Sequence, residues 1–334
     1  MARRSRLDLS IIIVNYEAWP DTVCLVQRIQ QLSNRLDQSV EIIVVDNGSQ
    51  THPLAKYCEE GAGVTYIRAE RNRGFAAGVN LGWRASHGEY LLVMNPDLVL
   101  LPTFLDGVNR WINQLRQEVY RQIGVVGFRL YSPNGAPQHS TGFFPTLWWT
   151  VLGLLFPRER RKYRLGPRRV GRVDWVSGAC FMVRRSVFET LHGLDERFFL
   201  YYEEVDFCWR VWKQKWQVVH DPQVGVIHLR PLEQRTVAPK LRVVLRHSLL
   251  HYFQKNLPYW QFMVMAVGVS IQAWTAYLLC GVISKMNGSR WIWRSILNIT
   301  REMIRRRNRS NHMGNPGKDS LWDTILADEA QQVL

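Results

Sequence analysis

The sequence predicts an α/β protein whose mostly parallel sheet is covered by helices on both faces, followed by a helical, membrane-associating C-terminal region. In the first half of the 334 residues, short β-branched runs alternate with longer amphipathic stretches, which is typical of a parallel sheet with crossover helices. Two polar clusters, at residues 46–49 and 95–97, directly follow expected strands. Later in the chain, the 28 residues 257–284 carry no charge, which is typical of a segment that contacts a membrane.

The first half contains five runs rich in β-branched and apolar residues that we expect to be strands. They are residues 10–16, 40–46, 64–68, 90–94 and 123–127. Between them, apolar residues at helical spacing predict helices over residues 22–36, 75–86 and 104–117. Further on, we expect strands at residues 173–177, 180–184 and 224–228 and a helix at residues 203–213. The two polar clusters then share the carboxyl edge of the sheet, where such sheets bind ligands.

The C-terminal region is expected to associate with a membrane. Residues 237–255 have a basic, helical pattern, and residues 262–283 are long enough to cross a bilayer, since roughly 20 apolar residues suffice. The next helix is predicted to be amphipathic and interfacial. Its apolar face contains Trp293, Ile296, Leu297, Thr300, Met303 and Ile304, and another face carries Arg294, Arg301 and Arg305. Basic residues on both flanks of the apolar segment favour a monotopic or re-entrant arrangement with both flanks cytoplasmic, and residues 309–334 are predicted to be a flexible tail.

The net charge of +15 arises almost entirely from an excess of Lys and Arg in the second half of the chain. Residues 1–150 contain 14 Lys or Arg and 13 Asp or Glu, whereas residues 151–334 contain 29 and 15. A basic surface attracts nucleic acid, anionic lipid or acidic substrates, and charge alone does not choose among them. The five cysteines are scattered and form no C-x-x-C pair, which favours a reducing compartment. The N-terminal apolar run is interrupted by Asp8 and indicates a strand rather than an export signal.

Two aspartates close the strands expected at residues 40–46 and 90–94. The Asp46 carboxylate can accept the ring N–H of a pyrimidine base, although Asp-Asn-Gly-Ser is also strong turn chemistry. Asp97 closes the run LLVMNPD, and a divalent metal that bridges two phosphates would balance its charge. A turn or helix cap is the alternative role for Asp97.

An acidic cluster opens the helix predicted at residues 203–213. The helix dipole favours Glu203, Glu204 and Asp206 at this position, but three carboxylates among aromatic residues exceed what capping needs. Aromatic surroundings raise the pKa of a carboxyl toward that of a useful general base. His228 ends an apolar strand, where it is either a hydrogen-bonded core residue or a ligand that suits Mn²⁺ better than Mg²⁺.

Taken in this order, the sequence resembles glycosyltransferase family 2, the inverting group with the GT-A fold, and especially its rhamnosyltransferase-like branch. The matching stretches are SIIIVNYEAW, EIIVVDNGSQ, RNRGFAAGVNLGWRAS, YLLVMNPDLVL, WVSGACFMVRRSVFETLHGLDERFFLYYEEVDFCWR and VGVIHL. The resemblance implies a Rossmann-like nucleotide-diphospho-sugar transferase (GT-A) domain at residues 7–230, a membrane-associating helical region at residues 237–308 and the tail at residues 309–334.

The resemblance also implies a role for each candidate residue. Glu204 is the base that deprotonates the acceptor hydroxyl, and Asp206 supports the helix start. Asp46 contacts the nucleobase, while Asp97 and His228 bind a divalent metal, Mn²⁺ or Mg²⁺. The other donor-binding residues are Asn15, Asn72 and Gly74, and the acceptor or sugar cleft contains Trp175, Gly178 and Glu203. An ordinary glycine-containing turn is the alternative for residues 72–74, and a core position is the alternative for Trp175.

Two departures from the family pattern concern the metal and the donor loop. Asn95-Pro96-Asp97 replaces a full Asp-x-Asp element, which implies modest metal affinity. His228 is followed by Leu-Arg-Pro-Leu rather than by glycines, although Arg230 and Arg235 are placed to contact the diphosphate. The aromatic residues 143–156, followed by eight Lys or Arg and one Glu through residue 172, predict a membrane-facing flap near a lipid-linked acceptor. A hydrophobic helix packed on the core is the alternative.

The sequence therefore predicts an inverting, metal-dependent glycosyltransferase of cell-surface polysaccharide synthesis at the cytoplasmic face of the plasma membrane. The expected donor is dTDP-rhamnose, with UDP-hexose or UDP-galactofuranose as alternatives, and the acceptor is a saccharide or a lipid-linked saccharide. No nucleic acid partner is expected, although the pI near 9.9 keeps a basic nucleic-acid-binding protein as a second class. A membrane scaffold with an inactive transferase domain is the third class. The sequence does not define the oligomeric state.

Overall fold

The computed structural model describes residues 7–33, 38–50, 63–148, 150, 164–230, 239–282 and 290–310. The chain divides into two compact units, residues 1–265 and 266–334. The first unit contains the sheet, its covering helices and the helix that follows them. The second unit contains most of the apolar helix and the last helix.

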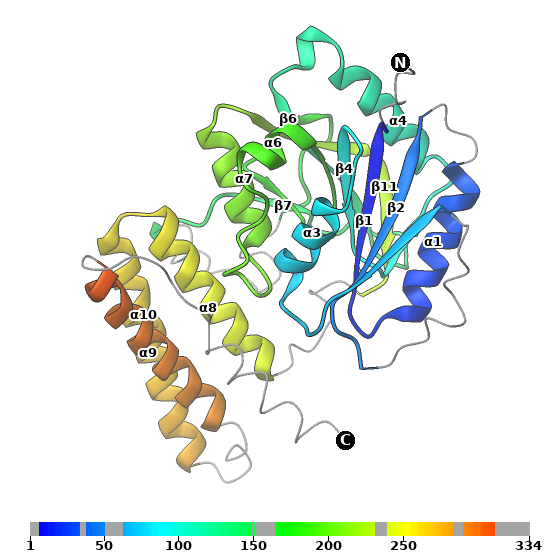
Figure 1. Ribbon diagram of the computed structural model, residues 1–334. Helices are drawn as coiled ribbons and strands as arrows, with labels where there is room; N and C mark the ends of the chain where they lie inside the picture. Colours follow the sequence, from blue (N-terminus) through cyan, green and yellow to red (C-terminus); the bar gives the residue numbers. More distant parts are fainter. Residues whose placement is uncertain are drawn as a thin grey trace. The chain divides into compact units, whose positions relative to one another are not determined.

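A nine-stranded mixed sheet forms the core of the first unit (Figure 1), with strand order β3-β2-β1-β4-β10-β6-β11-β5 and β8 paired to β11. Its strands are β1 (Leu9–Asn15), β2 (Val40–Asp46), β3 (Val64–Arg68), β4 (Tyr90–Met94), β5 (Leu98–Leu100), β6 (Ile123–Tyr131), β8 (Gly171–Arg172), β10 (Cys180–Arg184) and β11 (Gln217–His228). Strands β1 to β4 are parallel, and β6 is parallel to β11. Strand β10 runs antiparallel between β4 and β6. The predicted mostly parallel sheet is thus confirmed, and a separate pair joins β7 (Thr141–Gly142) to β9 (Trp175–Val176).

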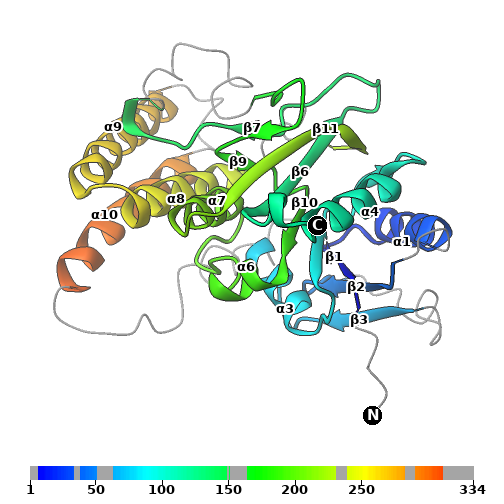
Figure 2. The ribbon, with the colours of Figure 1, turned by 90° about the horizontal axis from the view of Figure 1, so that it is seen from above.

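Helices cover both faces of the sheet (Figure 2), with α1 and α4 on one side and α3 and α6 on the other. They are α1 (Trp19–Ser33), α3 (Phe75–Arg84), α4 (Phe104–Leu115), α6 (Arg185–Thr190) and α7 (Glu203–Lys213), with a short 3₁₀ turn at Glu118–Tyr120. Because side chains alternate along a strand, Ile11 and Ile13 join the core cluster with Trp19 of α1. Ile12 points to the other face, where a Cβ added at Gly82 of α3 would lie 2.6 Å from its side chain. Small residues therefore let α3 approach the sheet closely.

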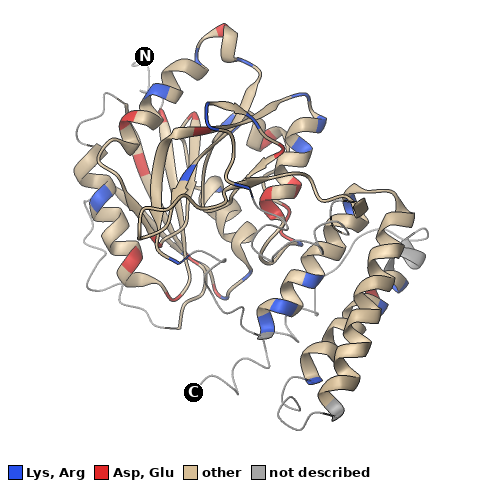
Figure 3. Cartoon of the chain, turned by 180° about the vertical axis from the view of Figure 1, so that it is seen from behind, with Lys and Arg blue, Asp and Glu red and all other residues tan. Residues whose placement is uncertain are grey.

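Three helices follow the sheet: α8 (Pro239–Asn256), α9 (Tyr259–Val282) and α10 (Arg290–Ser310). Among the described residues, one helix, at Tyr259–Cys280, is long and apolar enough to cross a membrane. Within the second unit, α10 buries the apolar stripe Ile292, Ile296, Ile299, Thr300 and Met303. Figure 3 shows Lys and Arg along α8 and acidic residues at the start of α7.

Several expected elements have different bounds in the structure. Strand β11 starts at Gln217 rather than at residue 224, because the chain passes Asp221 and Pro222 through a register shift, a bulge that tolerates proline. Strand β6 accordingly continues to Tyr131. In α10, Ile292 and Ile299 are buried in place of the expected Trp293, Leu297 and Ile304, which are half-buried. Residues 149 and 151–163 of the predicted flap lie outside the described part of the chain, as do Arg235 and residues 311–334.

Candidate active site

The carboxyl ends of β1 and β2 bring Asn15 and Asp46 side by side, since these residues are partners in the parallel pairing. Asn15 donates from Nδ2 to Asp46 Oδ1 over 3.2 Å and accepts at Oδ1 from the Thr22 hydroxyl over 3.0 Å. Ser49 donates to Asp46 Oδ1 from its hydroxyl over 2.5 Å and from its backbone N–H over 3.2 Å. Asp46 Oδ2 accepts no hydrogen bond from the described residues and lies 3.8 Å from Arg68 Nε. The Asp46 carboxylate is therefore fixed in orientation, and its Oδ2 is left to accept a hydrogen bond from a group such as the ring N–H of a base.

The loop after β2 is tied to the loop before α3. Asn47 donates from Nδ2 to Asn72 Oδ1 and to the Gly74 carbonyl, each over 3.0 Å. Gly74 has a φ of 89°, and a Cβ there would lie 2.2 Å from the Phe199 carbonyl oxygen. That carbonyl accepts the Phe75 N–H over 2.8 Å. Only glycine permits this approach, so Gly74 joins the loop before α3 to the loop that leads into α7.

Asp97 and His228 meet because β5 pairs with the end of β11, with Leu98 opposite His228. Both side chains are buried. His228 Nε2 lies 3.5 Å from Asp97 Oδ1, and Arg230 Nε lies 3.6 Å from Asp97 Oδ2. Arg230 also pairs with Asp21 near the start of α1. The two predicted metal ligands and the predicted diphosphate contact Arg230 thus lie together.

Gln138 fixes the ring of His228. Its Nε2 donates to the carbonyls of Tyr131 and His228 over 3.0 and 2.9 Å. Because carbonyl oxygens only accept, the amide nitrogen must face them, and the amide oxygen faces His228 Nδ1 at 3.1 Å. His228 Nδ1 therefore carries a proton. In the neutral ring Nε2 holds a lone pair that is turned toward Asp97, an arrangement that suits a divalent cation.

Glu203 and Glu204 open α7, and both are buried. The two residues before them, Tyr201 and Tyr202, have φ values of 70° and 71°. This left-handed conformation costs about 1–3 kcal/mol for each residue with a side chain, and it persists only where the surroundings hold it. A Cβ added at Gly178 would lie 3.6 Å from the Glu204 Cβ. The predicted cleft residue and the predicted base are therefore neighbours.

The pairing of β4 with β10 connects the metal-ligand pair to the acidic helix. The Asn95 N–H donates to the Ala179 carbonyl over 2.9 Å, so residues 177–179 lie beside the turn that carries Asp97 and against Glu204. Trp175 is fully buried and donates from Nε1 to the Phe143 carbonyl over 2.9 Å. This buried position agrees with the alternative of a core residue given above for Trp175.

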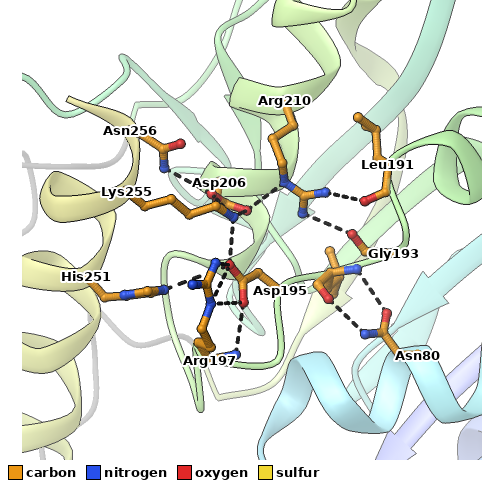
Figure 4. Close-up of polar contacts among 11 residues, drawn as sticks. Asn80, Leu191, Gly193, Asp195, Arg197, Asp206, Arg210, His251, Lys255 and Asn256 are labelled. Atoms are coloured by element: carbon orange, nitrogen blue, oxygen red, sulfur yellow. Dashed lines mark hydrogen bonds and ion pairs between the residues drawn. The ribbon is translucent and has the colours of Figure 1, made fainter. Parts of the chain in front are cut away.

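Asp206, in the first turn of α7, is fully buried among hydrogen-bond donors (Figure 4). Arg210 Nε donates to it over 2.8 Å, and Asn256 Nδ2 donates over 2.9 Å. Lys255 Nζ donates to Asp206 over 2.9 Å and to Asp195 over 2.6 Å. One ammonium group of α8 therefore bridges two carboxylates, one in α7 and one in the loop before it.

Asp195 is held in its charged form. Burial favours the neutral acid, but the nearby His251 ring, whose Nε2 lies 3.8 Å from Asp195 Oδ2, and the hydrogen bonds from Arg197 and Lys255 outweigh it and hold the pKa of Asp195 well below its usual range. Arg197 contributes a contact of 2.7 Å. The loop that precedes the acidic pair is thus fixed by charge as well as by backbone geometry.

Several residues of this arrangement were not predicted as site residues, among them Asn47, Gln138, Asp195 and Lys255. Asn47 could have been identified from the sequence, because it immediately follows Asp46 in the Asp-Asn-Gly-Ser turn. Asp195 lies in the matched stretch before the acidic pair. Gln138 and Lys255 carry no local signal, since their functional partners lie far away in the sequence.

Comparison with known proteins identifies similar sequences. A family model described as glycosyl transferase family 2 matches residues 10–191. The chain is 29% identical over 272 residues to the low-salt glycan biosynthesis hexosyltransferase Agl10 of Haloferax volcanii, covering 79% of this chain and 82% of that protein. It is 30% identical over 246 residues to the N-acetylglucosaminyl-diphospho-decaprenol L-rhamnosyltransferase of Mycobacterium tuberculosis, covering 66% and 75%. It is 24% identical over 225 residues to the rhamnosyltransferase WbbL of Escherichia coli, covering 64% and 82%.

Two solved structures have a similar fold. The mannosyltransferase PcManGT of Pyrobaculum calidifontis, in complex with GDP-Man and Mn²⁺, superposes with a TM-score of 0.51 at 14% identity, covering 89% of this chain and 86% of that chain. GalNAc-T7, with UDP, GalNAc and Mn²⁺, superposes with a TM-score of 0.50 at 17% identity. The latter match covers 77% of this chain and 52% of GalNAc-T7, so the present chain spans about half of that protein.

Proposed function

Because the chain belongs to glycosyltransferase family 2 and has its GT-A fold, we propose that it transfers a sugar, with inversion, from a nucleotide-diphosphate donor to a saccharide or lipid-linked saccharide. One observation carries this proposal. The carboxyl edge of the sheet carries Asp46, the proposed nucleobase contact, and Asp97 with His228, the proposed metal ligands. Strand β10 pairs with β4, and Gly178, just before β10, lies beside the buried Glu204.

The proposed reaction is a single displacement. Glu204 removes the proton from an acceptor hydroxyl, whose oxygen attacks the anomeric carbon on the face opposite the diphosphate. The bond to the diphosphate oxygen breaks as the new glycosidic bond forms, and the anomeric configuration inverts. Asp46 orients the base of the donor, and the Arg230 guanidinium, close to Asp97, suits the diphosphate.

Asp97 and His228 would hold a divalent ion, and their chemistry fits one. A carboxylate oxygen faces an imidazole nitrogen whose lone pair is fixed by Gln138, a donor pair that suits Mn²⁺ and also accepts Mg²⁺. The described residues contain no group of three or more His, Cys, Asp or Glu side chains able to hold a metal. The donor diphosphate and water would therefore supply the remaining ligands. When bound, the ion stabilises the negative charge that develops on the leaving diphosphate.

The proposed donor is dTDP-rhamnose. Two of the similar relatives are rhamnosyltransferases by name, while the hexosyltransferase Agl10 supports the alternative of a UDP-hexose. UDP-galactofuranose remains the third candidate from the sequence. The lipid diphosphate acceptor in the name of the mycobacterial relative favours a lipid-linked saccharide in cell-surface polysaccharide synthesis.

A cytoplasmic, membrane-attached location fits this acceptor. Helix α9 exposes large apolar side chains along its length, among them Trp260, Ile271 and Leu279, which are 59%, 59% and 57% exposed. Lys and Arg on either side of this helix favour anionic headgroups. The proposed arrangement is monotopic or re-entrant, with both flanks of α9 in the cytoplasm, where nucleotide sugars are available.

A donor screen tests the proposal. The full chain, in vesicles containing polyprenyl-diphosphate-linked saccharides and Mn²⁺, is incubated with labelled dTDP-rhamnose, UDP-hexoses and UDP-galactofuranose in turn. The expected result is label in the lipid fraction with dTDP-rhamnose, together with release of dTDP. Transfer from a UDP-sugar alone would move the assignment to that donor, and absence of transfer and of donor hydrolysis with all of them would contradict the proposed activity.

A further inference from the structure

We propose that helix α8 is part of the catalytic machinery: it braces the strained turn before Glu203 and Glu204, and Lys255 is a positioning residue for the base. This inference rests on the proposed role of Glu204. It assigns a catalytic contribution to a helix that lies beyond residues 10–191, the stretch matched by the family model.

The backbone before the acidic pair needs external support. Tyr201 and Tyr202 both have a positive φ, and such conformations relax unless neighbouring groups hold them. Helix α8 supplies part of this support. Ser248 donates its hydroxyl to the Leu200 carbonyl over 2.8 Å, and the ring of the buried Tyr252 lies 5.8 Å from that of Tyr202. A hydrogen bond and an aromatic contact therefore join helix α8 to the turn.

The front half of the same loop is anchored elsewhere. Arg210 of α7 donates to the carbonyls of Leu191 and Gly193 over 2.7 and 2.9 Å. Asn80 of α3 accepts the Leu194 N–H over 2.9 Å. The second half of the loop, which leads to the acidic pair, is held by the Phe75–Phe199 backbone hydrogen bond and by the contacts with α8.

Lys255 supplies the electrostatic part of the brace. Its ammonium joins Asp195 in the loop to Asp206 in the first turn of α7 (Figure 4), at 2.6 and 2.9 Å. Asn256 adds a hydrogen bond of 2.9 Å to the other oxygen of Asp206. Two carboxylates so placed in a buried site repel each other unless a cation lies between them. Removing the charge of Lys255 therefore weakens the link between the loop and α7, on either side of residues 201–204.

The consequence is a loss of alignment rather than a loss of donor binding. Glu204 and Asp206 both lie in the first turn of α7, so a shift of that turn moves the base relative to the acceptor hydroxyl. A misplacement of about 1 Å can lower turnover by about 100-fold. The proposed donor contacts lie elsewhere in the fold: Asp46 ends β2, and Asp97 lies in the turn between β4 and β5.

The test compares Lys255→Met with two matched variants. Lys255→Arg keeps the charge, and Arg242→Met removes one charge from an exposed position of the same helix. For Lys255→Met we expect kcat to fall about 10- to 100-fold while the KM for the donor stays within about threefold. Amide hydrogen exchange at residues 200–206 should accelerate in the same variant without a change in β1 and β2. Lys255→Arg should restore most of kcat, and Arg242→Met should behave like the wild type.

Several outcomes would overturn the brace. Wild-type kcat and unchanged exchange at residues 200–206 in Lys255→Met would show that the contact has no positioning role, and an equal effect of Arg242→Met would show a general effect of charge. Should Lys255→Met fail to fold, Ser248→Ala and Asn256→Ala remove single contacts, and wild-type kcat and exchange in both would equally reject the proposal. If no donor supports turnover by the wild type, the proposed function fails, and the exchange measurement still decides whether Lys255 holds the turn.

Discussion

The side-chain amide of Gln138 sets the protonation pattern of the His228 ring. Its oxygen lies 3.1 Å from Nδ1, while its nitrogen is committed to two carbonyls. The lone pair of Nε2 is thereby directed at Asp97, 3.5 Å away. Gln138 thus orients one of the two proposed metal ligands, as hydrogen-bond partners of metal-binding histidines commonly do.

Replacement of Gln138 should therefore weaken metal binding. Gln138→Met keeps the approximate volume but loses the amide, so His228 is no longer held in one tautomer and orientation. We expect Mn²⁺ affinity, measured by electron paramagnetic resonance in the presence of dTDP, to fall about 10- to 100-fold. Gln122→Met, at an exposed position, serves as the control. Equal Mn²⁺ affinities in the Gln138 variant and the wild type would show that the hydrogen bond does not prepare the ligand.

Metal removal should abolish turnover, because the proposed ion, held by Asp97 and His228, would balance the charge of the leaving diphosphate. Treatment with EDTA is expected to stop transfer, and Mn²⁺ or Mg²⁺ should restore it. Asp97→Ala should bind the donor far more weakly in a calorimetric titration. Full activity after exhaustive chelation would show that the transfer reaction does not require a metal ion.

Acid should destabilise the fold through His220, a fully buried residue of β11. Burial, with a smaller effect of the Arg129 charge, lowers the pKa of His220 from 6.5 to about 4. Between these values the unfolded chain binds a proton that the native ring does not. The neutral His220 ring therefore contributes fully to the free energy of unfolding above pH 6.5. This contribution is lost as the pH falls toward 4, and the loss is up to about 3 kcal/mol.

Urea unfolding across this pH range checks the assignment. His220→Gln cannot gain a proton, so its unfolding free energy should fall less steeply between pH 6.5 and 4 than that of the wild type. His192→Asn, at an exposed residue, should follow the wild-type slope. Identical slopes for the His220 variant and the wild type would assign the acid sensitivity to other groups.

The C-terminal segment should remain on the cytoplasmic side. In sealed inside-out vesicles, where the cytoplasmic face is outward, protease is expected to remove an epitope placed after Leu334, because both flanks of α9 are basic. An epitope at the N-terminus is the control for accessibility. Protection of the C-terminal epitope alone would show that the apolar helix crosses the membrane.

Local pattern was sufficient to predict much of the sheet. Residues 40–46, 64–68, 90–94, 180–184 and 203–213 have the predicted bounds in the structure, because each is a compact apolar run or begins with a clear acidic helix start. The carboxyl ends of parallel strands lie at the same edge of a sheet, which also predicted that Asp46 and Asp97 lie at one edge. These predictions depend on features within a few residues.

Long-range pairing could not be predicted in the same way. Strand β5 has three residues, too few to show a period, yet its pairing with β11 brings Asp97 to His228. Gln138 acts on a residue 90 positions away, and Lys255 bonds to residues 49 and 60 positions away. A basic helix pattern contains no information about which carboxylate one of its lysines will meet.

The role of Glu204 as the base is tested by the turnover of Glu204→Gln, compared with Glu203→Gln and the wild type, and by the anomeric configuration of the product. The wild type should give a product of inverted anomeric configuration by nuclear magnetic resonance. Glu204→Gln should lose about 10²- to 10⁴-fold in turnover, with donor affinity within a few-fold, and Glu203→Gln should be milder. A dead Glu203 variant beside a nearly normal Glu204 variant would move the base by one residue. Retained activity in both variants, or a retained anomeric configuration in the product, would contradict direct displacement with Glu204 as the base.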